Sequence, residues 1–303
     1  MTDTFITLDA NTLSNKEIHG YLVSAIAPRP IAFASTINQQ GKVNLSPFSY
    51  FNVFSTNPPI VVFSPARSGR TNETKHTLDN VLEVPEVCIG IVNHPIVEKM
   101  SLASTAYPKG VNEFVKAGFT EQPSEVIKPP RIRECPISME CTVDEVIALG
   151  DQGGAGNLVV SRVQRIHINK EYLNEAGKLD STKLDLVGRM GESWYCRADE
   201  DSMFEIPKPL RTTGMGVDQL PESIRNSPTL TANNVGRLGN LEELPSKKAV
   251  NTARGIEQVQ LILENQNHST QKQLTELQLL AKSYLEADDI DNAFSILMIA
   301  DEL

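Results

Sequence analysis

The sequence has 303 residues, of which 40% are hydrophobic and 22% are charged. This balance is typical of a folded globular chain with one large domain and a smaller one, and it excludes a disordered or fibrous protein. Lysine and arginine total 28 against 38 acidic residues, so the formal net charge is −10. Because such a charge repels nucleic acid and anionic membrane surfaces, we expect small molecules as ligands.

The cysteines indicate neither disulfides nor a metal site. They form no Cys-x-x-Cys pair and have no histidine pair nearby at zinc-ligand spacing: Cys88, Cys135, Cys141 and Cys196. The N-terminus has no apolar core of signal-peptide length, and no apolar run approaches the roughly 20 residues of a membrane helix. We therefore predict a cytoplasmic protein with reduced thiols, no metal and no membrane segment.

The first third of the chain alternates short strands with short helices. Ser14 and Glu17 have capping-box spacing, which predicts a helix from about residue 15 to 24. After Pro28 and Pro30, residues 31–37 are rich in β-branched and aromatic types, and a turn leads to a second strand at 43–45. Two more strands are predicted at 60–64 and 87–92, with a helix over 74–84 between them.

The middle of the chain predicts a long hairpin, and its end predicts helices. Strands at 137–148 and 158–168 flank the glycine-rich loop 150–156. Many short strands with few long helices indicate a mainly β fold, a β-barrel with flanking helices. The β pattern ends near residues 207–209. We predict a barrel domain over 1–210, a linker or barrel-covering extension over 211–254, and a small all-α C-terminal segment over 255–303.

The last helices are predicted to form an appendage and no repeat array. Small residues recur as in half of a helical-repeat unit, at Ala281, Ala287, Ala293 and Ala300. A solenoid needs about three or more repeats to bury its faces, and one is visible here. The acidic run at 288–291 lacks the glycine and terminal glutamate of a calcium loop, so it indicates the start of a helix.

The most informative segment is residues 44–52. Short polar side chains alternate there with aromatic ones and lie next to prolines: Asn44, Ser46, Ser49 and Asn52. This suits a flat ring held by backbone and small polar groups. An ordinary turn-rich loop has the same composition, so the residues by themselves leave both interpretations open.

Five motifs occur in a specific order: Pro-Arg-Pro-Ile-Ala at 28–32, Asn-Leu-Ser-Pro-Phe-Ser-Tyr-Phe-Asn at 44–52, Asn-Pro-Pro at 57–59, Lys-x-Thr-Leu-x-Asn at 75–80, and Gly-Arg-x-Gly-x-x-Trp-Tyr at 188–195. Together they resemble the flavin reductase-like, or FMN-binding split-barrel, family, which includes the reductase components of two-component monooxygenases. The resemblance covers roughly residues 18–210. It implies an FMN whose isoalloxazine ring lies against the second motif, with binding roles for Asn44, Ser46, Pro47, Ser49 and Tyr50.

The FMN phosphate needs positive charge and oriented donors. The segment 64–77 supplies these at the start of a predicted helix, in Ser64, Arg67, Arg70, Lys75 and Thr77. A solvated basic loop with a capping threonine would give the same pattern.

Three further residues are placed near the flavin by the resemblance: Arg29, Trp194 and Tyr195. A structural salt bridge for Arg29, and core packing for the two aromatic residues, are equally good interpretations. His76 and His94 receive no role, because a flavin transfers hydride through its own N5 and needs no general base from the protein. The catalytic residues therefore stay unassigned.

The resemblance implies an FMN-dependent oxidoreductase that is reduced by NAD(P)H and passes electrons to a small acceptor or a monooxygenase partner. We also expect a homodimer formed through the barrel. One departure bears on activity, since several such reductases have Gly-Asp-His where this chain has Gly150, Asp151 and Gln152. The alternative is a non-catalytic flavin-binding or redox-sensing protein whose helical tail binds a partner. Use of the barrel for haem or pyridoxal phosphate has less support, because neither an axial-ligand pair nor a Schiff-base lysine is evident.

Overall fold

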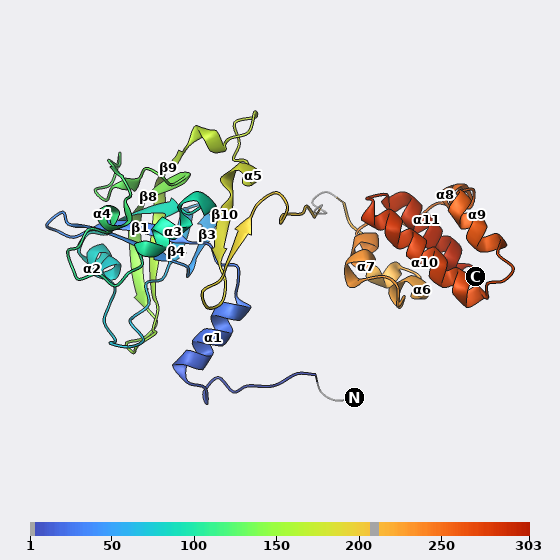
Figure 1. Ribbon diagram of the computed structural model, residues 1–303, viewed down its shortest axis with the longest axis horizontal. Coiled ribbons are helices and arrows are strands. Elements are labelled where there is room, and N and C mark those ends of the chain that lie inside the picture. Colours follow the sequence, from blue (N-terminus) through green and yellow to red (C-terminus); the bar gives the residue numbers. More distant parts are fainter. Residues whose placement is uncertain (1–3, 207–211) are drawn as a thin grey trace. The chain divides into compact units, whose positions relative to one another are not determined.

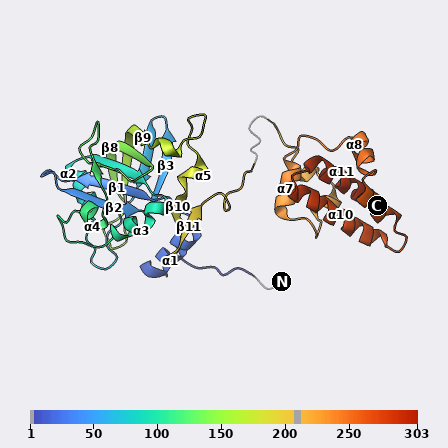
Figure 2. The ribbon, with the colours of Figure 1, turned by 45° about the horizontal axis from the view of Figure 1, so that its top comes forward.

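The computed structural model describes residues 4–206 and 212–303. The chain divides into two compact units, Met1–Phe204 and Glu205–Leu303. Figure 1 and Figure 2 show the sheet-rich first unit and the helical second unit. The domain boundary expected at residue 210 lies outside the described residues.

Unit 1 is built on a seven-stranded antiparallel sheet with the order β2-β1-β5-β8-β9-β4-β3. The strands are β1 (Ala32–Ile37), β2 (Val43–Phe48), β3 (Phe51–Thr56), β4 (Pro59–Phe63), β5 (Glu86–Ile91), β8 (Ile137–Ala148) and β9 (Asn157–Ile168). The two longest strands, β8 and β9, pair along their whole length and carry two register shifts. Such bulges increase the local twist, which helps a sheet to curl.

The sheet closes on itself. Strands β2 and β3 follow each other in the sequence but lie at opposite edges of the sheet. Phe48 of β2 nevertheless packs on Phe63 of β4, with ring centroids 5.5 Å apart. Strand β4 lies next to β3, at the edge of the sheet opposite β2. This curled sheet with its flanking helices confirms the predicted barrel.

Unit 1 also contains short helices: α1 (Asn15–Ala25), α2 (His76–Glu83), η1 (His94–Ile96), α3 (Val97–Leu102), α4 (Glu113–Ala117), η2 (Lys170–Tyr172) and α5 (Ser181–Leu184). Helix α1 projects from the barrel and buries only Val23 (Figure 1). The capping box predicted between Ser14 and Glu17 is present at the start of α1. Helix α2 buries Leu78 and Val81 in the barrel core. Two small hairpins complete the unit, β6 (Glu121–Gln122) with β7 (Arg131–Ile132) and β10 (Leu186–Arg189) with β11 (Tyr195–Ala198).

Unit 2 contains η3 (Val217–Gln219), α6 (Glu222–Arg225), α7 (Ala232–Gly239), α8 (Lys247–Ala253), α9 (Glu257–Glu264), α10 (Thr270–Glu286) and α11 (Ile290–Asp301). Its core joins the long helices α10 and α11 to residues of the shorter ones, including Leu220, Leu238 and Val250. The structure therefore differs from the linker or barrel-covering extension expected over 211–254, since much of this stretch belongs to the helical unit. The helices α6 to α8 are too short to show a clear helical period in the sequence.

All four cysteines are free, and Cys88, Cys135 and Cys141 are buried. Burial, with the nearby Glu140, raises the pKa of the Cys141 thiol to about 12. Within residues 4–206 and 212–303, no helix has the length and apolar character needed to cross a membrane. The same residues contain no group of three or more side chains arranged to hold a metal ion.

Candidate functional site

The polar segment 44–50 lies directly against the first turn of α2. The buried amide of Asn44 donates from Nδ2 to Oγ1 of Thr77 over 2.9 Å. One turn later, Asn80 donates to the hydroxyl of Thr36 on β1 over 3.1 Å. These two bonds hold the start of α2 on the β1–β2 hairpin, so that two predicted site residues from distant parts of the sequence are in contact.

Strand β2 is an edge strand, and a carboxylate from α4 holds its backbone. The N–H of Leu45 donates to Oε2 of Glu113 over 2.9 Å, and Glu113 is only 4% exposed. Burial raises the pKa of Glu113, and the Leu45 N–H acts in the opposite sense. The sequence analysis missed Glu113, because no local pattern indicates that α4 reaches β2. After Leu45, the predicted Ser46, Pro47 and Ser49 are half-buried.

The turn after β2 is tied to the loop that follows β4. The Ser64 N–H donates to the carbonyl of Tyr50 over 2.8 Å. The Ser64 hydroxyl accepts the N–H of Asn157, the first residue of β9, over 3.0 Å. Ser64 is buried, whereas Tyr50 is 39% exposed. The structure thus brings Ser64 next to the 44–50 segment.

The loop after Ser64 carries one arginine that is bonded within the loop and two cationic side chains that are exposed. Arg67 donates from Nε to Asn72 Oδ1 over 2.7 Å and from Nη2 to the Asn72 carbonyl over 2.6 Å, so most of its guanidinium closes the loop itself. Arg70 and Lys75 have exposed side chains. Lys75 is the N-cap of α2 and provides no side-chain cap to it. An ammonium beside uncapped first-turn N–H groups fits a phosphate.

Arg29 is buried and holds the end of α1. Its guanidinium donates to the carbonyls of Val23 and Ile26 and, over 3.0 Å, to that of Met190. Its partners are therefore backbone carbonyls and not the acidic group of a salt bridge. Burial lowers the pKa of Arg29, the nearby Tyr50 acts in the opposite sense, and Arg189 lowers it further. The backbones of Arg29 and Arg189 are also joined, by N–H to carbonyl bonds of 2.9 and 2.8 Å.

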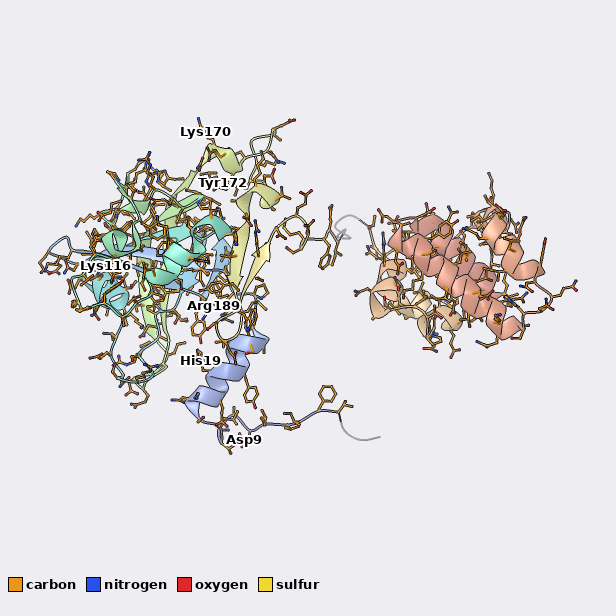
Figure 3. All side chains as sticks on the ribbon, viewed as in Figure 1. Asp9, His19, Lys116, Lys170, Tyr172 and Arg189 are labelled. Atoms are coloured by element: carbon orange, nitrogen blue, oxygen red, sulfur yellow. The ribbon has the colours of Figure 1, made fainter. Side chains whose placement is uncertain are left out.

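The β10–β11 hairpin carries the two predicted aromatic residues. Trp194 is 73% exposed in the hairpin turn, so it does not pack in the core of unit 1. Tyr195 lies under the Arg189 guanidinium, 4.7 Å from the ring centroid, and Figure 3 labels this arginine. A Cβ at Gly188 would be 2.7 Å from the Pro28 side chain, so the hairpin approaches the Pro-Arg-Pro motif too closely for a larger residue. Arg189, which the sequence analysis did not single out, thereby links the first and last motifs.

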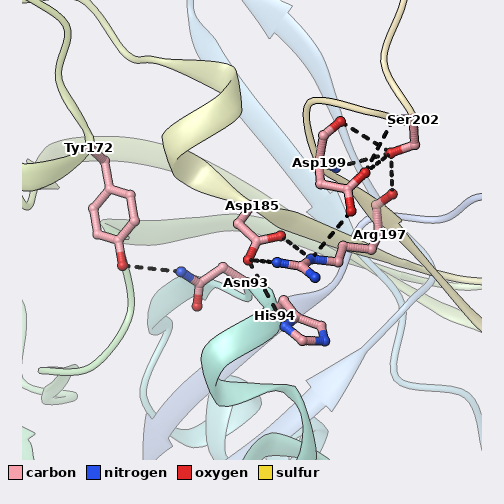
Figure 4. A network of polar contacts seen from close by, with 7 residues as sticks. All are labelled: Asn93, His94, Tyr172, Asp185, Arg197, Asp199 and Ser202. Atoms are coloured by element: carbon pink, nitrogen blue, oxygen red, sulfur yellow. Dashed lines mark hydrogen bonds and ion pairs between the residues drawn. The ribbon is translucent and has the colours of Figure 1, made fainter.

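A polar network anchors the same hairpin to the end of β5 (Figure 4). Asn93 donates to the hydroxyl of Tyr172 over 3.2 Å, and the His94 N–H donates to the Asp185 carbonyl over 2.9 Å. Arg197 of β11 donates from Nε to Asp185 Oδ1 over 2.6 Å. These contacts hold the hairpin against the end of β5. His94 takes part in them through its backbone N–H.

The loop between β8 and β9 packs on the basic loop. Asn72 donates to the carbonyl of Asp151 over 3.0 Å, and the Arg67 N–H donates to the carbonyl of Ala155 over 2.8 Å. Gln152, which stands where several reductases have histidine, is exposed in this loop. The departure noted in the sequence therefore lies beside the candidate phosphate site.

Unit 1 is similar to a known family of domains and to other proteins. The sequence model of the flavin reductase like domain family matches residues 24–183. An uncharacterized protein of Halalkalibacterium halodurans is 33% identical over 204 residues, which cover 67% of this chain and 96% of that protein.

Two solved structures also have a similar fold. Nitrilotriacetate monooxygenase component B from Bacillus cereus is similar with a TM-score of 0.62 at 30% identity, over 68% of this chain and 100% of that one. The 2-nitrobenzoate 2-nitroreductase NbaA of Pseudomonas fluorescens has a TM-score of 0.58 at 25% identity, over 69% of this chain and 100% of that one.

Proposed function

Because this chain belongs to the flavin reductase-like family, we propose that it is an FMN-dependent oxidoreductase that NAD(P)H reduces and that delivers electrons to a small acceptor or a monooxygenase partner. A flavin-related oxidoreductase is the class that the family and the similar structures support. The observation that carries the finer proposal is the contact of the 44–50 segment with both ends of the 64–77 segment, through Asn44 to Thr77 and through Tyr50 to Ser64.

The proposed roles follow from these contacts. The isoalloxazine ring lies against Asn44, Ser46, Pro47, Ser49 and Tyr50. Lys75, Arg70 and the first turn of α2 hold the phosphate, while Ser64 and Arg67 shape the loop that carries them. Bound FMN supplies hydride transfer at its own N5, so the chain needs to bind and orient it.

The residues around Arg29 form the proposed border of the ring site. Tyr50 and Tyr195 are partly exposed aromatic side chains, and Tyr195 lies under the Arg189 guanidinium. Trp194 extends this aromatic surface at the hairpin turn. In this arrangement Arg29 sets the positions of α1 and the hairpin, and the aromatic residues contact the flavin.

The proposal is tested on the purified protein. We expect flavin absorbance, release of FMN identified by mass, and NAD(P)H consumption with FMN bound. A protein that neither retains nor binds added FMN would refute the flavin assignment. Release of FAD in place of FMN would refute the assignment to FMN alone.

A second function is favoured by Gln152. If a histidine at this place seats the nicotinamide in other reductases, its absence from the exposed loop favours a non-catalytic flavin-binding or redox-sensing protein. The helical second unit would then bind the partner. Flavin binding without NAD(P)H consumption above the rate of free FMN would support this alternative. The proposed location for either function is the cytoplasm, in keeping with the free cysteines.

A further inference from the structure

The β10–β11 hairpin places two arginines and a tyrosine in one row. Arg189 lies opposite Tyr195 in the register of the hairpin, and Arg29 lies opposite Arg189 on its other side. Residues directly opposite each other on paired strands present their side chains to the same face, so these three side chains share one face. Figure 3 labels Arg189, to which the proposed flavin contacts assign no role.

No carboxylate neutralises the positive charge of this row. Within the part of the chain that the structure describes, neither Arg29 nor Arg189 forms an ion pair, and Glu192 in the hairpin turn is exposed. Arg197 of the same hairpin differs, because its Nε lies 2.6 Å from Asp185 (Figure 4). Arg29 donates to backbone carbonyls, and its buried Nε has no hydrogen-bond partner. A row of this kind attracts an anion.

Arg189 carries the guanidinium that a ligand can reach. Its contact from Nη1 to the Trp194 carbonyl is exposed and 3.5 Å long, so most of its N–H donors remain open to a ligand. The Tyr195 ring, 4.7 Å away, supports one side of the guanidinium. A Cβ at Gly191 would lie 2.5 Å from the Ser24 hydroxyl, so the hairpin turn packs tightly on the end of α1. The guanidinium therefore stands on a fixed support, as a preorganised site requires.

The charge and the surroundings of Arg189 favour an aromatic carboxylate. A carboxylate carries one negative charge and accepts two parallel N–H bonds from the planar fork of an arginine. A phosphate dianion would keep one charge unpaired, because the donors of Arg29 are directed to carbonyls. Trp194 is 73% exposed and Tyr195 is 36% exposed, which provides aromatic surface on which a flat ring can stack.

We propose that Arg189, together with Tyr195 and Trp194, binds an aromatic carboxylate, and that this is the class of small acceptor that the flavin serves. Arg189 is then the residue that determines specificity for the acceptor. The acceptor role rests on the proposed function, in which this hairpin borders the ring site. Carboxylate binding rests on the geometry of the hairpin alone.

Calorimetry on the full chain tests the carboxylate site with benzoate, with uncharged benzamide and with acetate, which lacks the ring. Benzoate should bind at least about tenfold more tightly than either, because the charge-assisted pair and the stacked ring act together. Arg189→Gln should remove the preference for benzoate over benzamide. Arg165→Gln, at an exposed position of β9, is the matched control and should keep it. Absence of benzoate binding to the unaltered chain, or a preference that survives Arg189→Gln, overturns the site.

Arg189→Lys covers the case in which the glutamine variant does not fold. It keeps the positive charge but loses the planar fork, so the preference for benzoate should fall without disappearing. A full preference in this variant would overturn the role of the fork.

Titration of the FMN-loaded protein tests the acceptor role. Benzoate should shift the absorbance of bound FMN, and Arg189→Gln should abolish this shift while FMN affinity stays the same. A loss of FMN affinity in that variant, or benzoate binding that leaves the flavin spectrum unchanged, overturns the acceptor role. If the chain binds benzoate through Arg189 but does not bind FMN, the proposed function fails and the carboxylate site stands. If it binds FMN but not benzoate, the proposed function stands and the carboxylate site fails.

Discussion

Glu140 of β8 is fully buried and accepts hydrogen bonds from a different part of the chain. The N–H groups of Glu125 and Val126 each donate to it over 2.8 Å, and Nε2 of His167 lies 2.7 Å away. Burial acts to raise the pKa of Glu140, but these N–H groups and His167 together hold it below its ordinary value. The carboxylate therefore fastens the loop around residues 123–131 to the sheet while it is ionised.

Protonation of Glu140 in acid should weaken the attachment of this loop to the sheet. Because the pKa of Glu140 is lower in the folded chain than in the unfolded chain, its contribution to stability is present above the unfolded pKa of about 4.3 and is lost as the pH falls through the folded pKa. Glu140→Gln should lower the free energy of unfolding by about 1 to 3 kcal/mol at neutral pH, and this difference should shrink in acid. Urea unfolding across a pH series measures it. Glu98→Gln, at an exposed position of α3, should have no such effect; a Glu140 effect that persists unchanged in acid would contradict the assignment.

The phosphate assignment gives a second prediction for single residues. Lys75→Ala with Thr77→Ala should weaken FMN binding at least about tenfold, because a charge and a hydroxyl donor are removed. Riboflavin, which lacks the phosphate, should bind almost unchanged. Since Thr77 also accepts the amide of Asn44, Lys75→Ala with Thr77→Ser is the control that keeps this bond. Equal FMN affinity in the double alanine variant and the unaltered chain would rule out the phosphate site.

At the scale of elements, α1 and the β10–β11 hairpin depend on one side chain. Arg29 donates to two carbonyls at the end of α1 and to Met190 just after β10. Arg29→Lys should reduce stability by about 1 to 3 kcal/mol, because an ammonium cannot reproduce the planar fork of the guanidinium. Hydrogen exchange in residues 18–26 should become faster. The exposed Arg165→Lys serves as control, and unaltered exchange in the Arg29 variant would show that the contacts are dispensable.

The elements that the sequence predicted are those with a strong local signal. The capping box at Ser14 and the strand over 137–148 lie where the sequence predicts them, and the long helices α10 and α11 lie within the predicted all-α segment. Strand β3 was missed because it is an edge strand with mostly exposed side chains and no alternation of burial.

The candidate site was predictable only in part, for a related reason. Motifs identify Asn44 and Thr77, but their contact depends on how α2 packs across β1 and β2. Glu113 enters the site region through a contact with Leu45, which is far from it in the sequence, and no local pattern indicates such a contact.

For the whole molecule, the division into units predicts that the tail is dispensable for flavin binding. A chain that ends at Leu210 should fold and bind FMN, because every residue assigned to the flavin lies in unit 1. The ratio of flavin to protein and the oligomer size, compared between full and shortened chains, measure this. A soluble, folded shortened chain without flavin would show that the site extends into unit 2.

The exposed apolar surface of unit 1 predicts a homodimer. Val53 and Phe54 on the edge strand β3 are 61% and 68% exposed, and Ile26 at the end of α1 is 63% exposed. A two-fold partner would cover such surface. Light scattering should give twice the chain mass of 33.3 kDa, and Phe54→Glu should shift the mass toward the monomer. A monomer at micromolar concentration in the unaltered chain would exclude the dimer.

Trp194 is the single tryptophan of the chain, and it stands exposed on the β10–β11 turn of unit 1. Intrinsic fluorescence excited through tryptophan is therefore a spectroscopic reporter of the barrel unit alone, and the helical unit is silent at that wavelength. Because the indole ring faces solvent, its emission starts red-shifted, and any flavin, partner or second copy that covers it changes the emission without a label.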